Sequence, residues 1–385
     1  MKNKYLFTLS IAAILTLAAC STAVKVPNEI NFTISNLETT DFHTELQKGL
    51  IDSEDPDGYI DDHWLDVGSF SNSAPNALSF SWKVETDNNA KASKYVVSLS
   101  ESESFDNVLT YSSTKETVDI YNLKINTTYY WKVSAYYGSK SFDSDVANFK
   151  TISDGPRNIY VDGVENVRDL GGYVTESGKE FKQGLVYRTA QFNYNRSDED
   201  AIKSAPTAKG KQTLLKELKL KSEIDVRQRK TSKGKDETVG IKSSPLGSSV
   251  KYQYMPMSFG GSNIFEEESN FESIKQFFDY CSHEENYPLA FHCVRGTDRT
   301  GALAYALGSL CGVSEELLLK DYLFSNFANI NGTIRERDID GTSFYVRGIR
   351  DAEGSTRSEK TMNYLNSTVG VSKTSLEAIK NILLK

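Results

Sequence analysis

Ten consecutive residues decide the fold of this chain: His292-Cys293-Val294-Arg295-Gly296-Thr297-Asp298-Arg299-Thr300-Gly301. A short apolar stretch, 287–291, precedes them, and an alanine- and leucine-rich segment, 302–310, follows. This order predicts a strand, a tight loop and a helix. A cysteine ends the strand, and an arginine six positions later begins the helix. Such a loop suits a tetrahedral dianion, because backbone N–H groups and the positive end of the helix point at one place.

The residue types of this loop favour nucleophilic chemistry on phosphate. The positive field around Cys293 favours the thiolate, which is the nucleophilic form of cysteine. Arg299 can offer two parallel N–H donors to two phosphate oxygens. The alternative is a buried cysteine that only packs at the end of a strand. The intact loop predicts substrate contacts from Val294, Arg295, Gly296, Thr297, Asp298 and Arg299.

The loop resembles the HC-x5-R-[ST] signature of cysteine-dependent phosphatases, and in full the HCxxGxDRTG form of the atypical bacterial tyrosine and lipid phosphatase family. The resemblance implies that Cys293 forms a phosphocysteine, that Arg299 holds phosphate oxygens and that Asp298 is the general acid. It also implies that Thr300 hydrogen-bonds the sulfur and that His292 orders the loop. Many tyrosine phosphatases carry the acid on a Trp-Pro-Asp loop, but all three tryptophans precede residue 153 and none precedes Pro-Asp.

Three further segments resemble the same family, so that the likeness covers about residues 158–385. They are NVRDLGGY at 166–173, GLVYRTA at 184–190 and EIDVR at 223–227. We expect Arg168 and Asp169 to form a pair that supports the active loop, and Arg227 to lie near it. A structural salt bridge remote from the chemistry is the alternative for the pair.

One position of the loop bears on the substrate. The family often has lysine before the aspartate, where it is associated with phosphoinositide substrates, but this chain has Thr297. Arg295 restores a positive charge two residues after the nucleophile. Phosphotyrosine is therefore the first choice of substrate, and a phosphoinositide or inositol polyphosphate is the alternative.

Composition bounds the class of protein. The 385 residues are 38% hydrophobic and 25% charged, which fits a soluble globular protein of two or three domains. A net charge of -8 argues against general affinity for nucleic acid. Four cysteines are too few for a disulfide scaffold. Cys281 and Cys311 flank the active loop in sequence, and a bridge between them stays an open alternative.

The first residues predict export and a lipid anchor. Lys2 and Lys4 precede an apolar run, 5–19, that is short for a membrane span and ends in small residues. Leu17-Ala18-Ala19-Cys20 resembles the lipobox of bacterial lipoproteins. The resemblance implies cleavage after residue 19, acylation of Cys20 and a membrane-anchored protein of the bacterial cell envelope that faces outside the cytoplasm. An ordinary signal peptide is the alternative.

Residues 30–152 predict an all-β domain. Period-two patterns at 77–85, 94–100, 108–111, 118–123 and 127–138 alternate with polar turns, as in a β-sandwich. The segment 123–129 resembles the LxPxTxY stretch of fibronectin type III domains, with Tyr129 as the tyrosine-corner residue and Ile125 in place of the usual proline. Within this part, the acidic residues 40–70 are expected to form a solvated loop; Ser53 to Gly58 only faintly resembles a calcium loop.

The predicted fold class is α/β, a cysteine-phosphatase fold with a central sheet flanked by helices, preceded by a smaller all-β sandwich. We expect a lipoprotein signal peptide at 1–19, a tether at 20–29, the fibronectin type III-like sandwich at 30–152, a linker at 153–157 and the phosphatase domain at 158–385. Near the C-terminus, Thr374-Ser375-Leu376-Glu377 predicts a capping box for the last helix.

The predicted function is hydrolysis of phosphate monoesters through a phosphocysteine, by a protein-tyrosine phosphatase with dual-specificity or lipid phosphatase as variants. A surface adhesin that uses the phosphatase fold as a platform belongs to another class, and the intact Cys293, Asp298 and Arg299 argue against it. An arsenate reductase also uses a Cys-x5-Arg loop, but suitably placed shuttle cysteines are not evident. The chemistry needs no metal or cofactor. The expected partners are a phosphorylated protein or lipid substrate and the membrane; the oligomeric state stays open.

Overall fold

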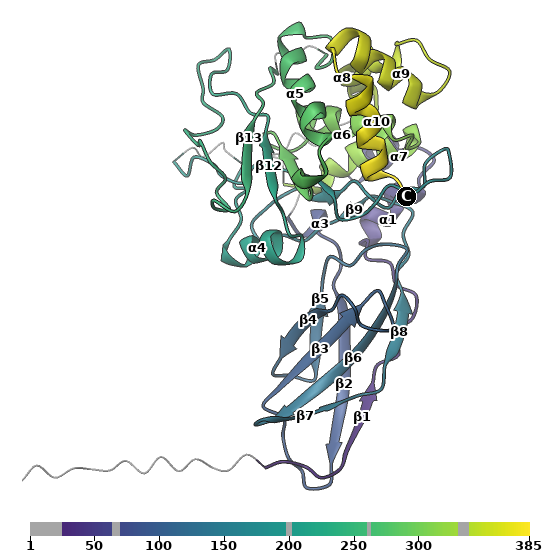
Figure 1. Cartoon of the computed structure of the whole chain (residues 1–385), viewed down its shortest axis with the longest axis vertical. Coiled ribbons are helices and arrows are strands. Elements are labelled where there is room, and N and C mark those ends of the chain that lie inside the picture. Colours follow the sequence, from purple (N-terminus) through teal and green to yellow (C-terminus); the bar gives the residue numbers. More distant parts are fainter. Residues whose placement is uncertain (1–24, 64–69, 198–201, 260–262, 330–338) are drawn as a thin grey trace, which may run out of the picture.

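The computed structural model describes residues 25–63, 70–197, 202–259, 263–329 and 339–385. A β-rich domain and a larger α/β domain lie end to end (Figure 1). The predicted signal peptide, Cys20 and the first half of the tether lie outside the described residues. In the part of the chain that is described, no helix is both long and apolar enough to cross a bilayer.

The β-rich domain is a sandwich of two antiparallel sheets. One sheet has the order β1-β2-β5, and the other has the order β4-β3-β6-β7 with β8 paired to β6. Buried and exposed residues alternate along β2 and β6, so that one face of each sheet enters the core around Phe80, Val97 and Trp131. The strands are β1 (Ile30–Ile34), β2 (Leu78–Thr86), β3 (Lys94–Ser100), β4 (Leu109–Ser113), β5 (Thr117–Ile120), β6 (Thr128–Tyr137), β7 (Lys140–Asp143) and β8 (Ala147–Lys150).

The tyrosine corner of this domain has the expected geometry. The hydroxyl of Tyr129 accepts a hydrogen bond of 2.9 Å from the backbone N–H of Lys124. At Ile125, the residue that replaces the usual proline, the backbone N–H donates to Gln183 Oε1 at 2.8 Å and the carbonyl accepts from Gln183 Nε2 at 2.9 Å. A proline has no N–H to donate. Ile125 therefore fixes the sandwich to the α/β domain.

The described part of the acidic segment 40–70, up to residue 63, is largely helical, so the expectation of a solvated loop is wrong there. It contains α1 (Glu45–Asp52) and α2 (Pro56–Asp62), and α3 (Phe70–Ser73) follows. Thr44 and Asp55 cap the first two helices with their side chains. The acidic residues face outward, while Leu50 and Ile60 are buried against the α/β domain. We call α1 and α2, residues 45–62, the helical insert.

Residues 153–157, expected to be a linker, are largely buried. Ser153, Pro156 and Arg157 are inaccessible, and Arg157 already belongs to the sheet of the α/β domain. Gly172, with φ +105°, packs at the same junction, where an added Cβ would lie 2.6 Å from Ile125 Cδ1. The two domains therefore meet through a packed interface with specific hydrogen bonds.

The α/β domain is built on a six-stranded mixed sheet of order β13-β12-β14-β11-β10-β9. Strands β11 to β14 are parallel, and the short β9 and β10 are antiparallel at one edge. All residues of β11, β12 and β14 are buried, as expected for parallel strands covered on both faces. The strands are β9 (Arg157–Asn158), β10 (Arg168–Asp169), β11 (Val186–Thr189), β12 (Ser222–Asp225), β13 (Lys251–Tyr254) and β14 (Leu289–His292).

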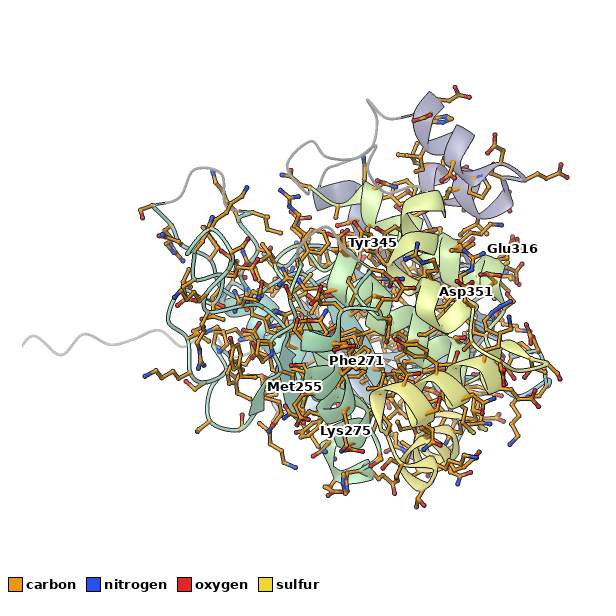
Figure 2. All side chains as sticks on the ribbon, turned by 90° about the horizontal axis from the view of Figure 1, so that it is seen from above. Met255, Phe271, Lys275, Glu316, Tyr345 and Asp351 are labelled. Carbon is orange, nitrogen blue, oxygen red and sulfur yellow. The ribbon has the colours of Figure 1, made fainter. Side chains whose placement is uncertain are left out.

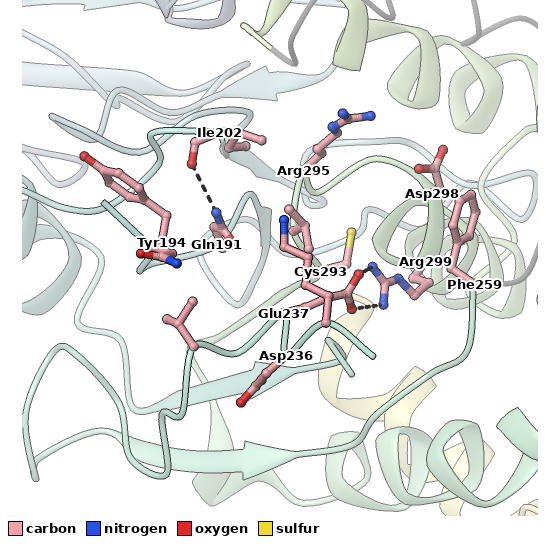
Figure 3. Close-up of a pocket in the computed structure, with 14 residues that line it drawn as sticks. Gln191, Tyr194, Ile202, Asp236, Glu237, Phe259, Cys293, Arg295, Asp298 and Arg299 are labelled. Atoms are coloured by element: carbon pink, nitrogen blue, oxygen red, sulfur yellow. Dashed lines mark hydrogen bonds and ion pairs between the residues drawn. The ribbon is translucent and has the colours of Figure 1, made fainter. Parts of the chain in front are cut away.

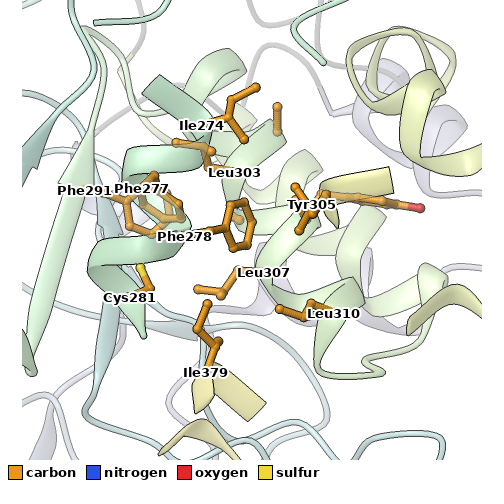
Figure 4. Close-up of a cluster of buried hydrophobic side chains, with 14 of the residues drawn as sticks. Ile274, Phe277, Phe278, Cys281, Phe291, Leu303, Tyr305, Leu307, Leu310 and Ile379 are labelled. Carbon is orange, nitrogen blue, oxygen red and sulfur yellow. The ribbon is translucent and has the colours of Figure 1, made fainter. Parts of the chain in front are cut away.

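Helices cover this sheet, and α6 lies at the centre of the main core. Phe277 and Phe291 meet edge to face at 5.2 Å between ring centroids, with Leu303 and Leu307 of α6 beside them (Figure 4). Met255 is buried in this core and Phe271 packs partly buried against it, whereas Glu316 and Asp351 are exposed; Figure 2 labels all four from above. The helices are α4 (Ala208–Gln212), α5 (Phe271–Cys281), α6 (Asp298–Leu310), α7 (Glu315–Leu323), η4 (Phe324–Phe327), α8 (Ile339–Arg350), α9 (Arg357–Tyr364) and α10 (Lys373–Leu383). Short η1 (Thr213–Glu217), η2 (Glu268–Asn270), η3 (Glu284–Asn286) and η6 (Leu365–Val369) complete them.

Two smaller sequence-based expectations are settled by the same core. Cys281 and Cys311 are buried, unbridged thiols, and burial raises the pKa of both. The capping box expected at Thr374 is wrong. The last helix begins at Lys373, because the Ser372 hydroxyl accepts from the backbone N–H of Ser375 at 3.0 Å.

Candidate active site

The active loop joins the C-terminal end of β14 to the N-terminus of α6. Strand β14 ends at His292 and α6 begins at Asp298, each one residue before the boundary that the sequence predicts. Gly296 has φ +71°, and an added Cβ would lie 2.4 Å from the carbonyl oxygen of Thr189. Only glycine fits this backbone conformation and this close approach to β11. Ser314 caps α7 with its side chain, whereas Thr297 makes no such bond at the N-terminus of α6.

Four consecutive carbonyl groups of the loop accept hydrogen bonds, three from neighbouring segments and one from the first turn of α6. Val294 O accepts from the backbone N–H of Gln191 at 3.1 Å, and Arg295 O accepts from Asn166 Nδ2 at 3.1 Å. Gly296 O accepts from Arg188 NH2 at 2.7 Å, and Thr297 O accepts from the N–H of Gly301 at 2.6 Å.

These outward carbonyls orient the rest of the loop. The C=O and N–H of a planar trans peptide point in opposite directions. The N–H groups of residues 295–298 therefore point to the inner side of the loop. Together with the start of α6 they form a concave ring of donors, which is the shape that a phosphoryl group requires.

Cys293 lies at the base of this ring. It is only 2% exposed, and its backbone N–H donates to Thr300 Oγ1 at 2.8 Å. The Thr300 hydroxyl therefore lies next to the nucleophile, on the first turn of α6. His292 Nε2 lies 3.0 Å from Glu223 Oε1, and its Nδ1 lies 3.2 Å from Cys293 O. The imidazole thus ties the end of β14 to β12.

Arg299 is held by a carboxylate that sequence reasoning did not identify. Its NH1 donates to Glu237 Oε2 at 2.8 Å and its NH2 donates to Glu237 Oε1 at 3.1 Å (Figure 3). NH1 also donates to Met257 O at 3.2 Å. Burial opposes the charge of the guanidinium, but Cys293 and Glu237 outweigh it and raise the pKa of Arg299. Burial would raise the pKa of Glu237, and Arg299 lowers it below its usual value.

Counting the donors of Arg299 shows which edge faces the substrate. A guanidinium has five N–H groups, and Glu237 and Met257 take three of them. The two that remain belong to Nε and NH2, which form one planar edge. That edge matches two oxygens of a phosphoryl group. Glu237 thus orients Arg299 without occupying its phosphate-binding fork.

Asp298 lies at the first position of α6 and lines the pocket. Its Oδ2 accepts from Thr297 Oγ1 at 3.1 Å, and its Oδ1 accepts from the hydroxyl of Tyr322 at 3.3 Å. Asp236 also lines the pocket, but its carboxylate points away from Cys293 (Figure 3). Asp236 instead accepts from the backbone N–H groups of Thr238 and Gly240. Of these two aspartates, Asp298 is the one placed for proton transfer.

The loop opens into a pocket of about 250 Å³. Phe259 and Val239 form apolar walls and are each 40% exposed. Arg299 lies 5.8 Å from the ring centroid of Phe259. The complete lining is Gln191, Tyr194, Asn195, Ile202, Lys235, Asp236, Glu237, Val239, Phe259, Cys293, Val294, Arg295, Asp298 and Arg299.

The expected pair of Arg168 and Asp169 does not form, so that prediction is wrong. Neighbouring residues of a strand point to opposite faces of the sheet. Arg168 donates to Asp321 Oδ1 at 2.8 Å and also to Asn166 Oδ1. Asp169 pairs with Arg157 at the junction with the sandwich. Arg168 still supports the active loop, because it donates to the side chain of Asn166, and Asn166 in turn donates to the carbonyl of Arg295.

Arg227 lies behind the pocket, one layer away from the loop. It pairs with Asp225, and its NH1 donates to Glu237 O at 3.0 Å and to Gln191 Oε1 at 3.1 Å. Burial would raise the pKa of Asp225, but His292 and Arg227 hold it at about 2. Arg227 therefore supports the segment that carries Glu237.

Other supporting residues were also missed. Arg188 and Glu223 lie within the segments GLVYRTA and EIDVR, whose likeness to the family is visible although no role is. Asp321 gave no signal in sequence, since it lies within an ordinary helix. Arg188 and Glu223 contact the loop and Asp321 reaches it through Arg188, because parallel strands and α7 converge there.

Two family models match the chain. The model of the tyrosine phosphatase family matches residues 159–385, and the model of the fibronectin type III domain matches residues 68–149. A search of curated proteins gave no match.

Similar solved structures include the catalytic core of Siw14, with 16% identity, a TM-score of 0.27 and coverage of 44% of this chain and 82% of that one. They also include the core catalytic domain of the PP-IP phosphatase SIW14 from S. cerevisiae in complex with citrate. That match has 17% identity, a TM-score of 0.27 and coverage of 43% of this chain and 82% of that one.

The family match covers the domain that holds the active loop, apart from the short strand β9 at its start. This match agrees with the site geometry, in which Cys293 lies at the base of a ring of amides and the guanidinium of Arg299 lies beside it. The chain belongs to the tyrosine phosphatase family and is a cysteine-type phosphatase.

Proposed function

We propose that this protein is a protein-tyrosine phosphatase of the bacterial cell envelope. The observation that carries the choice of substrate is the pair of apolar walls beside Cys293. Of the large apolar side chains exposed in the described residues, Phe259 and Val239 line the catalytic pocket. Exposed apolar surface inside a polar pocket favours a flat aromatic ring over a polyhydroxylated inositol ring.

The first chemical step forms the phosphocysteine. The Cys293 thiolate attacks phosphorus and forms an S–P bond as the bond between phosphorus and the tyrosyl oxygen breaks. Loop amides and the Arg299 fork stabilise the charge on the three non-bridging oxygens. Asp298 gives a proton to the leaving oxygen.

The second step releases phosphate. The Asp298 carboxylate takes a proton from a water molecule, which attacks phosphorus and breaks the S–P bond. Inorganic phosphate leaves and the thiolate is restored. Thr300 hydrogen-bonds the sulfur as it departs, from the position that its bond with the Cys293 amide gives it.

The second candidate is a phosphoinositide or inositol-polyphosphate phosphatase. Two cationic side chains, Arg295 and Lys235, line the same pocket and would attract a second phosphate group. A substrate with several phosphates would use them, whereas phosphotyrosine uses the apolar walls. The two candidates therefore differ in which part of the pocket binds the substrate: the cationic side chains for a polyphosphate and the apolar walls for phosphotyrosine.

A substrate panel tests this proposal. Purified residues 21–385 and a Cys293→Ser variant are assayed on phosphotyrosine peptides, phosphoserine peptides, short-chain phosphoinositides and inositol polyphosphates, with and without a chelator. We expect the highest kcat/KM on phosphotyrosine peptides and none with the serine variant. Preference for inositol phosphates would select the second candidate. If the wild-type protein hydrolyses none of these monoesters, both enzymatic candidates are excluded and the surface-adhesin hypothesis remains.

The proposed location rests on the lipobox-like stretch that ends at Cys20. Acylation of Cys20 would anchor the chain outside the cytoplasm, with the sandwich between the anchor and the catalytic domain. Labelling of bacteria with a fatty-acid analogue tests this. We expect incorporation into the wild type and none into a Cys20→Ala variant; equal labelling of both would contradict the anchor.

A further inference from the structure

Helix α7 contacts the catalytic machinery with two neighbouring side chains. Asp321 is 4% exposed. Its Oδ1 accepts a hydrogen bond from Arg168 Nε at 2.8 Å, and its Oδ2 accepts one from Arg188 NH1. Arg188 in turn donates to the loop carbonyls of Gly296 at 2.7 Å and Thr297 at 3.4 Å. The position of Asp321 thus determines where the loop backbone is held.

Tyr322, the next residue, contacts the proposed general acid. Its hydroxyl donates to Asp298 Oδ1 at 3.3 Å. Its ring packs on α6, where a Cβ added to Gly301 would lie 2.8 Å from Tyr322 Cδ2. Tyr322 is 2% exposed, so it has little freedom to move away from Asp298.

The residues that follow, at the end of α7 and in η4, contact the helical insert. Leu323, Phe324 and Phe327 form one buried cluster with Leu50 and Ile60 of the insert. This cluster is separate from the main core of the α/β domain and is made by segments more than 260 residues apart in sequence.

Polar contacts fix the same interface. Lys320 Nζ donates to Ile51 O at 2.6 Å. The ring of His43 meets Phe324 edge to face at 5.9 Å, and its Nε2 lies 2.7 Å from Pro156 O. In Figure 1, α1 lies at the junction of the two domains beside α7. The insert is therefore oriented as well as buried.

The insert lies outside both family matches, since it covers residues 45–62 and the matches begin at residues 68 and 159. We propose that the helical insert positions α7, and that Tyr322 on α7 is a positioning residue for Asp298. The insert thereby makes the N-terminal part of the chain a component of the active site's support. This inference rests on the proposed role of Asp298 as general acid.

The sharpest test removes one hydroxyl. Tyr322→Phe keeps the buried ring and removes the hydroxyl that donates to Asp298. We expect kcat on an alkyl phosphate, whose leaving group needs a proton, to fall about tenfold with KM unchanged, as expected for loss of one hydrogen bond that orients the acid. The kcat on p-nitrophenyl phosphate, a good leaving group, should change less than about twofold. Equal losses on both substrates, or no loss on either, would overturn the role.

A double-mutant cycle separates this role from that of Asp298 itself. If Tyr322 acts through Asp298, Tyr322→Phe should add no further loss in an Asp298→Asn background. Additive losses would contradict the proposal. If Asp298→Asn alone slows hydrolysis of both substrates equally, Asp298 is not the general acid. That result comes from the single variant, so it is distinguishable from a failure of the role proposed for Tyr322.

A second pair of variants tests the insert. Leu50→Ala opens the cluster against α7, and Leu99→Ala makes the same change in the sandwich core; both leucines are fully buried. Both proteins are assayed at a temperature where circular dichroism shows them folded. We expect Leu50→Ala to lower kcat on the alkyl phosphate at least about fivefold without a change in KM, and Leu99→Ala to leave it unchanged. Equal behaviour of the two variants would overturn the coupling.

Discussion

At the scale of single residues, the phosphate-binding arginine depends on a carboxylate 62 positions away in sequence. Glu237 takes the NH1 and NH2 edge of Arg299 and leaves the Nε and NH2 edge for substrate. Without that anchor the long side chain would have to be ordered by the substrate alone, at a cost in conformational entropy. Glu237 therefore pre-organises the fork before substrate arrives.

We expect Glu237→Gln to lower kcat/KM roughly 10–100-fold, equivalent to about 1.4–2.7 kcal/mol of transition-state stabilisation. The neutral amide holds Arg299 at one atom instead of two, so that the fork is less well aligned. Steady-state kinetics on p-nitrophenyl phosphate measures the loss. Glu266→Gln, which breaks the exposed pair with Arg347, is the matched control and should have no effect. An increase in activity would show instead that the carboxylate competes with substrate.

The sequence shows the catalytic loop but not its supports, for a physical reason. Cys293, Asp298 and Arg299 lie within seven consecutive residues, so that their spacing alone defines the site. Glu237 and Asp321 reach it only through the fold. The pairing of Arg168 with Asp169 was wrong because adjacency along a strand places two side chains on opposite faces.

At the scale of elements, the segment that follows β13 supplies the apolar side of the pocket. Phe259 lies beside Arg299 on one side and Tyr345 of α8 on the other, with ring centroids 5.9 Å apart. An aromatic side chain of this kind stays exposed at an energetic cost unless a ligand covers it. Its position beside the nucleophile suits a substrate ring.

We expect Phe259→Ala to raise KM for phosphotyrosine peptides about five- to twentyfold, because stacking and burial of one ring contribute roughly 1–2 kcal/mol. The kcat value should change little, since the side chain does not touch the reacting atoms. Methyl phosphate, which has no ring, should show no change in kcat/KM. Val174→Ala, an exposed apolar residue outside the pocket, is the control. Equal effects on both substrates would contradict the aromatic wall.

Element boundaries followed from the sequence where periodicity was strong. The expected strand at 94–100 coincides with β3, and the pattern expected at 77–85 is shifted by one residue in β2. The helical insert was missed because α1 and α2 are only eight and seven residues long, which is too short for periodicity to stand out among the neighbouring acidic residues. Their stability comes from caps and from packing on α7, which sequence periodicity does not report.

At the scale of the whole molecule, Glu165 joins three distant parts of the chain. Its Oε2 accepts from the N–H of Asn329, its side chain bonds with Ser73 beside the insert, and its carbonyl accepts from Ala190 next to the active loop. Burial raises the pKa of Glu165 to about 7, and the bonds with Asn329 and Ser73 oppose part of that rise. The carboxylate is thus held where the domains meet.

This raised pKa predicts a pH dependence of stability. Between the ordinary pKa of 4.5 and about 7, the folded protein keeps a proton that the unfolded chain has lost, so stability falls as pH rises through this window. The loss amounts to at most about 3 kcal/mol. Glu165→Gln, which stays neutral, should raise Tm by a few degrees at pH 8 and leave it unchanged at pH 4.

Thermal unfolding at the two pH values, followed by circular dichroism, measures this difference. Glu101→Gln, a half-exposed glutamate that pairs with Lys124, serves as the control for a simple change of charge. The control should show no such pH dependence. A Glu165→Gln variant less stable than the wild type at pH 8 would contradict the burial of an unfavourable charge.

The overall charge of -8 gives no long-range attraction for phosphate, so affinity must come from the local ring of amides and Arg299. The division into a sandwich and an α/β domain could be expected from the two kinds of periodicity. The packed junction could not, because the contacts of Arg157, Ile125 and the insert join residues far apart in sequence.

The central claim is that Cys293 captures the phosphoryl group. The most direct measurement is rapid acid quenching of the reduced protein with a phosphorus-labelled aryl phosphate, followed by peptide mapping. We expect a labelled phosphoryl group on the peptide that carries Cys293 in the wild type and none in Cys293→Ser. Release of phosphate without such a label, or a label that persists in Cys293→Ser, would contradict it.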